Sequence, residues 1–181
     1  MNINYTSGLV IVTGPVKSGK SIWAEKIIAH NHGKVTYIAT SSIYNNDEIW
    51  KKRIQIHKER RPKEWNLVES ADIFKILTTI NQESSVLIDS LGGIITKSLT
   101  LNNEDWHNHR NLIVNAISTF KGLIVIVCEE VGWGVSPATH NGNLFRDRLG
   151  DLVDRLDQFS LDSWLVIHGR AINIYKNSIR I

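Results

Sequence analysis

Five short apolar runs recur along the chain, and each is rich in β-branched side chains. In order they are Leu9–Thr13, Val35–Thr40, Val86–Asp89, Leu123–Cys128 and Trp164–His168. The runs are continuously apolar rather than alternating, which is typical of strands covered on both faces. Stretches with helical periodicity separate most of them, and this alternation predicts a mainly parallel sheet flanked by helices in an α/β domain. One more short strand is expected at Ala171–Tyr175.

Three polar or amphipathic stretches between these runs also have a predicted structure. Asp47–Arg61 carries acid-before-lysine pairs four residues apart and stops before Pro62, so a helix is expected there. A second helix is expected from Phe145 through Leu156. The most polar stretch, Leu101–Arg110, is interpreted as a surface excursion.

The first apolar run leads directly into a glycine-rich loop with the spacing G-x-x-x-x-G-K-S. Its residues are Gly14, Pro15, Val16, Lys17, Ser18, Gly19, Lys20 and Ser21. In such a loop, backbone N–H groups wrap a polyphosphate at the positive end of the following helix. Lys20 would reach the outer phosphates, and the Ser21 hydroxyl would bind Mg²⁺. A strand before the loop and a helix after it favour this interpretation over a chance Gly/Ser-rich turn.

The predicted helix at Asp47–Arg61 places an imidazole among guanidinium groups. Arg53, His57 and Arg61 fall four apart and share a face, with Arg60 beside them. Guanidinium groups bind phosphate, and they would keep His57 neutral and nucleophilic near neutral pH. Spacing alone leaves two alternatives open, a second phosphate site and a solvated basic helix, and it favours the second.

Two acidic strand ends are further candidates. Asp89 ends a buried run downstream of the phosphate loop, where an acid is the usual Mg²⁺ partner, although it could also cap the next helix. Glu129 and Glu130 end another run and precede a loop in which glycines flank Trp133. That tryptophan could cover an apolar ligand, stack on a ring or fill a subunit contact, and the sequence does not separate these roles.

Composition narrows the class of protein. The 181 residues suffice for one domain, expected to span 1–181, and the net charge of +3 gives no reason to expect a nucleic-acid partner. The single cysteine, Cys128, rules out an internal disulfide and suits a reducing compartment. No secretory signal or run long enough for membrane insertion is visible, so a soluble cytoplasmic protein is expected.

Together these residues carry a resemblance that covers nearly the whole chain. The phosphate loop is followed by Ala24-Glu25, and a second segment has the pattern R-I-x-x-H-x-x-x-R-P-x-x-W, which begins at Arg53. Further matches are Tyr37–Thr40, Val86–Asp89, Glu130–Pro137 and Phe145–Gly150. The chain resembles the bifunctional adenosylcobinamide kinase / adenosylcobinamide-phosphate guanylyltransferase family of cobalamin synthesis. The second pattern is far more specific than a phosphate loop, and it reverses the preference for a solvated helix.

The resemblance implies a RecA-like P-loop NTPase fold, a homotrimer and two reactions. A nucleoside triphosphate, ATP or GTP, phosphorylates adenosylcobinamide; GTP then donates GMP to that phosphate and releases pyrophosphate. His57 matches the histidine that carries GMP covalently, and Lys20 is the second catalytic residue expected. Beyond the phosphate loop, the implied nucleotide contacts are Thr40, Ser41, Ser42, Lys58, Glu59, Arg60, Arg61, Glu69 and Asp89. Ser21 and Asp89 are the expected Mg²⁺ ligands.

Some positions depart from the family pattern, and other functions stay open. Many relatives have a second histidine where Ile56 stands and an asparagine where Glu129 stands. These changes bear on corrinoid contacts and base preference more than on phosphoryl chemistry. The alternatives are another P-loop small-molecule kinase and a RecA-type nucleotide-binding module, neither of which would transfer GMP, and loss of one of the two activities.

Overall fold

A seven-stranded sheet forms the centre of the computed structural model, which describes residues 4–31, 33–41 and 48–181. The strands are β1 (Gly8–Gly14), β2 (Val35–Ala39), β3 (Asn66–Glu69), β4 (Ser85–Asp89), β5 (Leu123–Glu129), β6 (Asp162–Ile167) and β7 (Arg170–Asn173). Their order across the sheet is β3-β2-β4-β5-β1-β6-β7, and all neighbours are parallel except β6 and β7. β5 therefore separates the phosphate-loop strand β1 from β4, which ends in Asp89.

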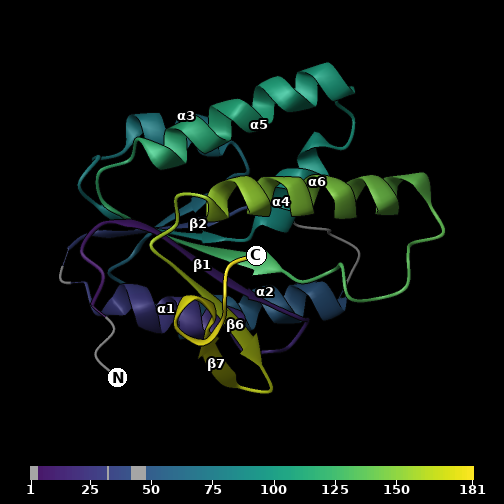
Figure 1. The fold of residues 1–181 in the computed structure, drawn as a ribbon. Coiled ribbons are helices and arrows are strands. Elements are labelled where there is room, and N and C mark those ends of the chain that lie inside the picture. Colours follow the sequence, from purple (N-terminus) through teal and green to yellow (C-terminus); the bar gives the residue numbers. More distant parts are fainter. Residues whose placement is uncertain (1–3, 32, 42–47) are drawn as a thin grey trace.

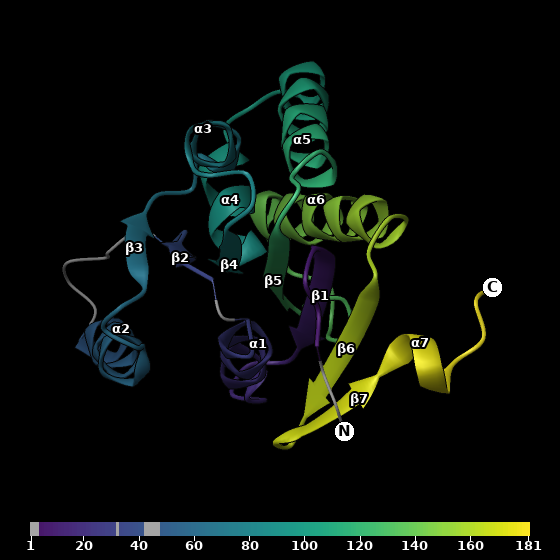
Figure 2. The ribbon, with the colours of Figure 1, turned by 90° about the vertical axis from the view of Figure 1, so that its left-hand side faces the viewer.

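Helices cover both faces of this sheet. They are α1 (Lys20–Ala29), α2 (Glu48–Arg60), α3 (Ile73–Thr79), α4 (Leu91–Ser98), α5 (Asn103–Ser118), α6 (His140–Asp157) and α7 (Ile174–Asn177). α1 and α2 lie on one face and α3, α4, α5 and α6 on the other, whereas α7 lies at the edge beside β6 and β7 (Figures 1 and 2). Within α2, the side chains of some residues, Arg53 and His57 among them, are outside the described part.

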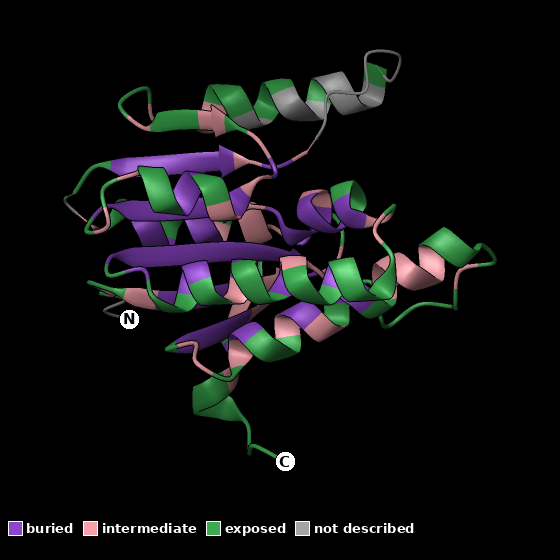
Figure 3. Ribbon diagram, turned by 90° about the horizontal axis from the view of Figure 1, so that it is seen from above, coloured by how far each residue is buried: buried purple, intermediate pink, exposed green. Residues whose placement is uncertain are grey.

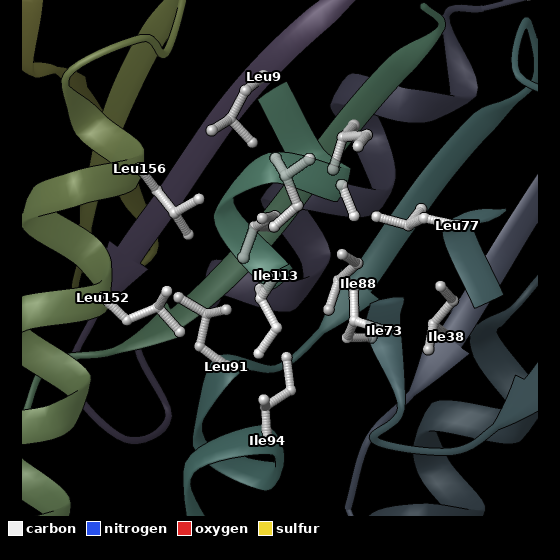
Figure 4. Close-up of a cluster of buried hydrophobic side chains, with 14 of the residues drawn as sticks. Leu9, Ile38, Ile73, Leu77, Ile88, Leu91, Ile94, Ile113, Leu152 and Leu156 are labelled. Carbon is white, nitrogen blue, oxygen red and sulfur yellow. The ribbon is translucent and has the colours of Figure 1, made fainter. Parts of the chain in front are cut away.

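Continuous apolar runs in the central strands supply a core on each side of the sheet. Because side chains alternate along a strand, Leu9 and Ile11 join the cluster beneath α3 to α6, while Val10 and Val12 join the cluster beneath α1. The strands at the centre are buried, and the outer faces of the helices are exposed (Figure 3). The larger cluster interleaves strand residues such as Ile88 with helix residues of α3 to α6 (Figure 4). This packing fixes the strands whose ends carry the site.

The parallel arrangement brings the carboxyl ends of all the central strands to the same side of the sheet. β1 pairs with β5 through Gly14↔Glu129, and β2 pairs with β4 through Ala39↔Asp89. The phosphate loop, Thr40 and Asp89 therefore lie at one edge, where open α/β sheets bind their ligands.

The predicted strands are confirmed, with ends shifted by a residue or two, but one strand was not predicted. β3 is short and mostly exposed at the sheet edge, so it has no apolar run. The expected strand at Ala171–Tyr175 ends at Asn173, whose side chain caps α7 by accepting from Lys176 N. The helix expected at Asp47–Arg61 is confirmed as α2, while Asp47 lies outside the described residues.

Two expectations about the second half were wrong. Leu101–Arg110 is not a surface excursion, because α5 begins at Asn103 and buries Trp106 and Arg110. α6 begins at His140 rather than Phe145, since the Thr139 hydroxyl caps it by accepting from Gly142 N at 3.1 Å. In the described part of the chain, no helix combines the length and the apolar character that a membrane span needs.

Candidate active site

The phosphate loop connects the end of β1 to the start of α1 through a backbone that demands glycine at two positions. Gly19, the N-cap of α1, has φ 98°, in the left-handed region. A Cβ on Gly14 would lie 2.3 Å from the carbonyl oxygen of Val166 in β6. The motif glycines are thus explained by conformation and by close packing against a neighbouring strand.

Segments far away in the sequence hold the loop in place. Gly169, in the turn between β6 and β7, donates its N–H to the Ser18 carbonyl at 3.0 Å, and Glu130 N donates to the Gly14 carbonyl at 3.0 Å. The Lys20 ammonium donates to the Pro15 carbonyl at 3.2 Å, so it lies across the loop. A cation over a loop of this shape is suited to the charge of a polyphosphate.

Ser21 and Asp89, the two predicted Mg²⁺ ligands, lie close together at the carboxyl ends of the strands. The Ser21 hydroxyl lies 3.4 Å from Asp89 Oδ1. Hard oxygen donors are the ligands Mg²⁺ prefers, and it commonly uses one or two protein oxygens beside substrate phosphates and water. Among the residues that the structure describes, no cluster of three or more His, Cys, Asp or Glu side chains could hold a metal. The Ser21–Asp89 pair therefore fits a phosphate-bound magnesium ion rather than a closed protein cage.

Tyr37, in the middle of β2, holds the other oxygen of Asp89. Its hydroxyl donates to Asp89 Oδ2 at 2.6 Å. Burial, together with the Asp89 charge, raises the pKa of Tyr37 far above its usual range, so the phenol stays a proton donor. Arg61 lies over the Tyr37 ring, 3.8 Å from guanidinium carbon to ring centroid, and Trp65 stacks at 6.4 Å. The Tyr37 hydroxyl thereby orients the Asp89 carboxylate.

A second link joins the end of α2 to α1. Arg60 donates from Nε to Glu25 Oε2 at 2.6 Å and from Nη2 to Oε1 at 2.7 Å. Glu25 is 7% exposed, and its hydrogen bonds raise the pKa of Arg60. This ion pair therefore links the last turn of α2, which begins with His57, to the helix that starts at the phosphate loop.

The strand ends beside Asp89 are tied to the start of α4. The Thr40 hydroxyl donates to the Ser90 carbonyl at 2.6 Å and accepts from Ser90 N at 3.0 Å. Glu129 accepts from the Ser90 hydroxyl and from Gly92 N, the latter at 2.9 Å. The N-cap of α4 is Ser90, not Asp89, so the alternative role of Asp89 as a cap is not realised. Glu129, whose role the sequence left open, supports the first turn of α4.

The remaining predicted residues are more scattered. Lys58 pairs with Glu69 of β3 at 3.5 Å, and Glu59 accepts from Gln55 at 2.8 Å. Ser42 lies outside the described residues, as does the His57 side chain. The structure therefore brings Lys20, Ser21 and Asp89 together, and the predicted nucleotide contacts stay predictions.

Two residues at this site were not assigned a role from the sequence. Tyr37 and Glu25 both stand inside segments that the family pattern includes. What each one contacts is supplied by a residue far along the chain, so no local spacing could indicate it. The feature that marks these two residues as functional candidates is a polar group on a buried side chain, and burial is known only once the fold is known.

The fold and the loop together define a phosphate-loop nucleotide-binding protein with the RecA-like α/β architecture. Residues 10–174 match the family described as cobinamide kinase / cobinamide phosphate guanyltransferase (CobU), and the chain belongs to this family. That family consists of transferases.

Curated relatives match over most of their length. The chain is 29% identical to the bifunctional adenosylcobalamin biosynthesis protein CobU of Salmonella typhimurium, over 92% of this chain and 99% of that protein. It is 28% identical to CobP, of the same description, from Pseudomonas aeruginosa, over 77% of this chain and 82% of that one. A solved structure from Pyrococcus horikoshii OT3 is similar in fold, with a TM-score of 0.55 and 10% identity over 98% of this chain and 90% of that one.

Proposed function

We propose that this protein phosphorylates adenosylcobinamide and then converts the phosphate to adenosylcobinamide-GDP through a GMP adduct on His57. A single domain spanning residues 1–181 carries out both steps in the cytoplasm, as a homotrimer. Family membership supports the pair of reactions. The observation that carries the proposal is the bidentate ion pair between Arg60 and Glu25, because it links the helix that bears His57 to the helix that begins at the phosphate loop.

In the first reaction the substrate hydroxyl oxygen attacks the γ-phosphorus of the triphosphate. The bond to the β-phosphate oxygen breaks, a nucleoside diphosphate leaves, and the hydroxyl proton passes to solvent. Lys20 and the loop amides hold the phosphates in line. Ser21 and Asp89 would hold Mg²⁺, which supplies charge neutralisation on the phosphate oxygens when bound.

In the second reaction a neutral His57 nitrogen attacks the α-phosphorus of GTP. A P–N bond forms, the bond to the β-phosphate oxygen breaks, and pyrophosphate leaves. A phosphate oxygen of adenosylcobinamide phosphate then attacks the same phosphorus, so the P–N bond breaks and a phosphoanhydride forms. The covalent intermediate divides one difficult transfer into two in-line displacements.

The test is incubation with α-labelled GTP and Mg²⁺, followed by measurement of label on the protein. We expect an acid-labile, base-stable adduct, as a phosphoramidate requires, and none in His57→Ala. His107→Ala is the matched control, because this exposed histidine lies on α5, on the opposite face of the sheet from α2. Undiminished labelling of His57→Ala removes His57 from the nucleophile role. Transfer of γ-label to adenosylcobinamide without any adduct would leave a small-molecule kinase.

A further inference from the structure

The C-terminal end of α2 is attached to the rest of the site by two consecutive arginines. Arg60 contacts Glu25 of α1, and Arg61 covers the ring of Tyr37, which in turn holds Asp89. One arginine thus links α2 to the helix behind the phosphate loop, and the other links it to the strand beside the acid. Both attachments lie within four residues after His57.

Glu25 is the unusual member of this set. A nearly buried carboxylate is costly unless it is paired and hydrogen-bonded, and here Arg60 occupies both of its oxygens in a bidentate pair. Such a pair adds little net stability compared with apolar side chains of the same volume. It does fix the relative orientation of the two side chains, because a planar guanidinium binds a carboxylate bidentately in one arrangement.

The positions of Arg60 and Glu25 in their helices suggest why a fixed orientation between α2 and α1 matters. Arg60 stands three residues after His57, so the two share a face of α2 one turn apart. Glu25 stands five residues after Lys20 on α1. The ion pair therefore sets the distance between the turn that bears the histidine and the helix that begins at the phosphates. Rates of covalent transfer fall steeply when the attacking atom is misplaced by an ångström.

We propose that Glu25 is a positioning residue for guanylylation: through Arg60 it holds the His57 turn of α2 against the phosphate loop. The proposal rests on the proposed role of His57. The sequence suggested that Arg60 contacts the nucleotide. In this proposal Arg60 also positions helix α2.

The test is the rate of adduct formation from α-labelled GTP in Glu25→Gln, Arg60→Gln and the double variant, at saturating nucleotide. We expect Glu25→Gln to slow labelling about 10- to 100-fold. In Glu25→Gln the affinity for a non-hydrolysable GTP analogue with Mg²⁺ should stay near that of the wild type, because neither the loop nor any predicted nucleotide contact is changed. The double variant should be no slower than the slower single variant, because each single change already breaks the Glu25–Arg60 pair. Hydrogen exchange of the α2 amides should be faster in Glu25→Gln.

Asp151→Asn is the matched control. It makes the same carboxylate-to-amide change in the Arg110–Asp151 pair of α5 and α6, which is also linked at 2.6 Å and lies away from the site. It should lower stability without slowing the labelling of folded protein.

Four results would overturn the role of Glu25. They are a wild-type labelling rate in Glu25→Gln, a loss explained entirely by weaker analogue binding, a double-variant loss equal to the product of the single losses, and unchanged exchange in α2. Absence of an adduct in the wild-type protein would refute the proposed function and this role together. A normal wild-type adduct with an undiminished rate in Glu25→Gln would refute the role alone.

Discussion

Replacing Tyr37 by Phe would test whether orientation of Asp89 matters for magnesium. The change removes one hydroxyl, which donates to Asp89 Oδ2 at 2.6 Å. The ring remains, so the contacts with Arg61 and Trp65 are retained. The substitution therefore isolates a single hydrogen bond to the acid beside Ser21.

The expected magnitude follows from the setting of that bond. A hydrogen bond to a charged group contributes about 1.5–3 kcal/mol when the partner is buried. Asp89 is only partly buried, so water can replace some of the loss, and we expect a decrease of about 1 kcal/mol in the free energy of unfolding. Losing a group that orients a metal ligand costs about 10- to 100-fold in metal affinity. Ser21 also contacts Asp89, so the lower end, about tenfold or 1.4 kcal/mol, is expected.

The assay is the Mg²⁺ concentration dependence of phosphoryl transfer from γ-labelled triphosphate, measured at saturating nucleotide. Tyr175→Phe is the matched control. The Tyr175 hydroxyl also donates to an aspartate, Asp157 Oδ1, at 3.0 Å, and Tyr175 lies in α7, beside the outermost strands of the sheet. We expect the midpoint for Mg²⁺ to rise in Tyr37→Phe and to stay unchanged in Tyr175→Phe. An unchanged midpoint in Tyr37→Phe, with a normal maximal rate, would refute the view that this hydroxyl orients a metal ligand.

Two further predictions concern residues away from the site. Buried Arg148 donates to the carbonyls of Ser98 at 2.6 Å and Leu101 at 2.7 Å, at the end of α4. Arg148→Met should therefore cost about 3 kcal/mol in urea unfolding while folded protein labels normally, and a loss near zero would contradict this. Burial lowers the pKa of His109 below its usual 6.5, so the unfolded chain takes up the proton first. Wild-type stability should then fall as pH drops through 6.5 towards the lower folded-state pKa, and His109→Gln should flatten this decline in thermal melts; parallel curves would contradict the assignment.

The sequence predicted best what depends on local pattern. The central strands are largely apolar because both faces are covered, so the apolar runs in the sequence located β1, β2, β4 and β5. The phosphate loop could be predicted equally well from the sequence, because its shape is set by Gly14 and Gly19 together with the strand and helix at its two ends.

What the sequence did not predict depends on contacts between distant segments. The start of α5 is polar, and its buried face consists of Trp106 and Arg110, an arginine that is tolerated inside because Asp151 of α6 pairs with it. β3 exists because it pairs with β2 at the sheet edge, not because its own side chains are apolar. Within the site, neither Tyr37 nor Glu25 has a neighbour in sequence that shows its contact.

The support of the phosphate loop by the turn between β6 and β7 affects how the protein is made. The loop is complete by residue 21, yet β1 pairs with β5 and β6, and Ser18 is bound by Gly169. Residues 1–169 therefore have to leave the ribosome before the loop has all of these supports and can bind a triphosphate in this shape. Nucleotide therefore stabilises the folded domain by mass action, and it does not stabilise a chain that is still being synthesised.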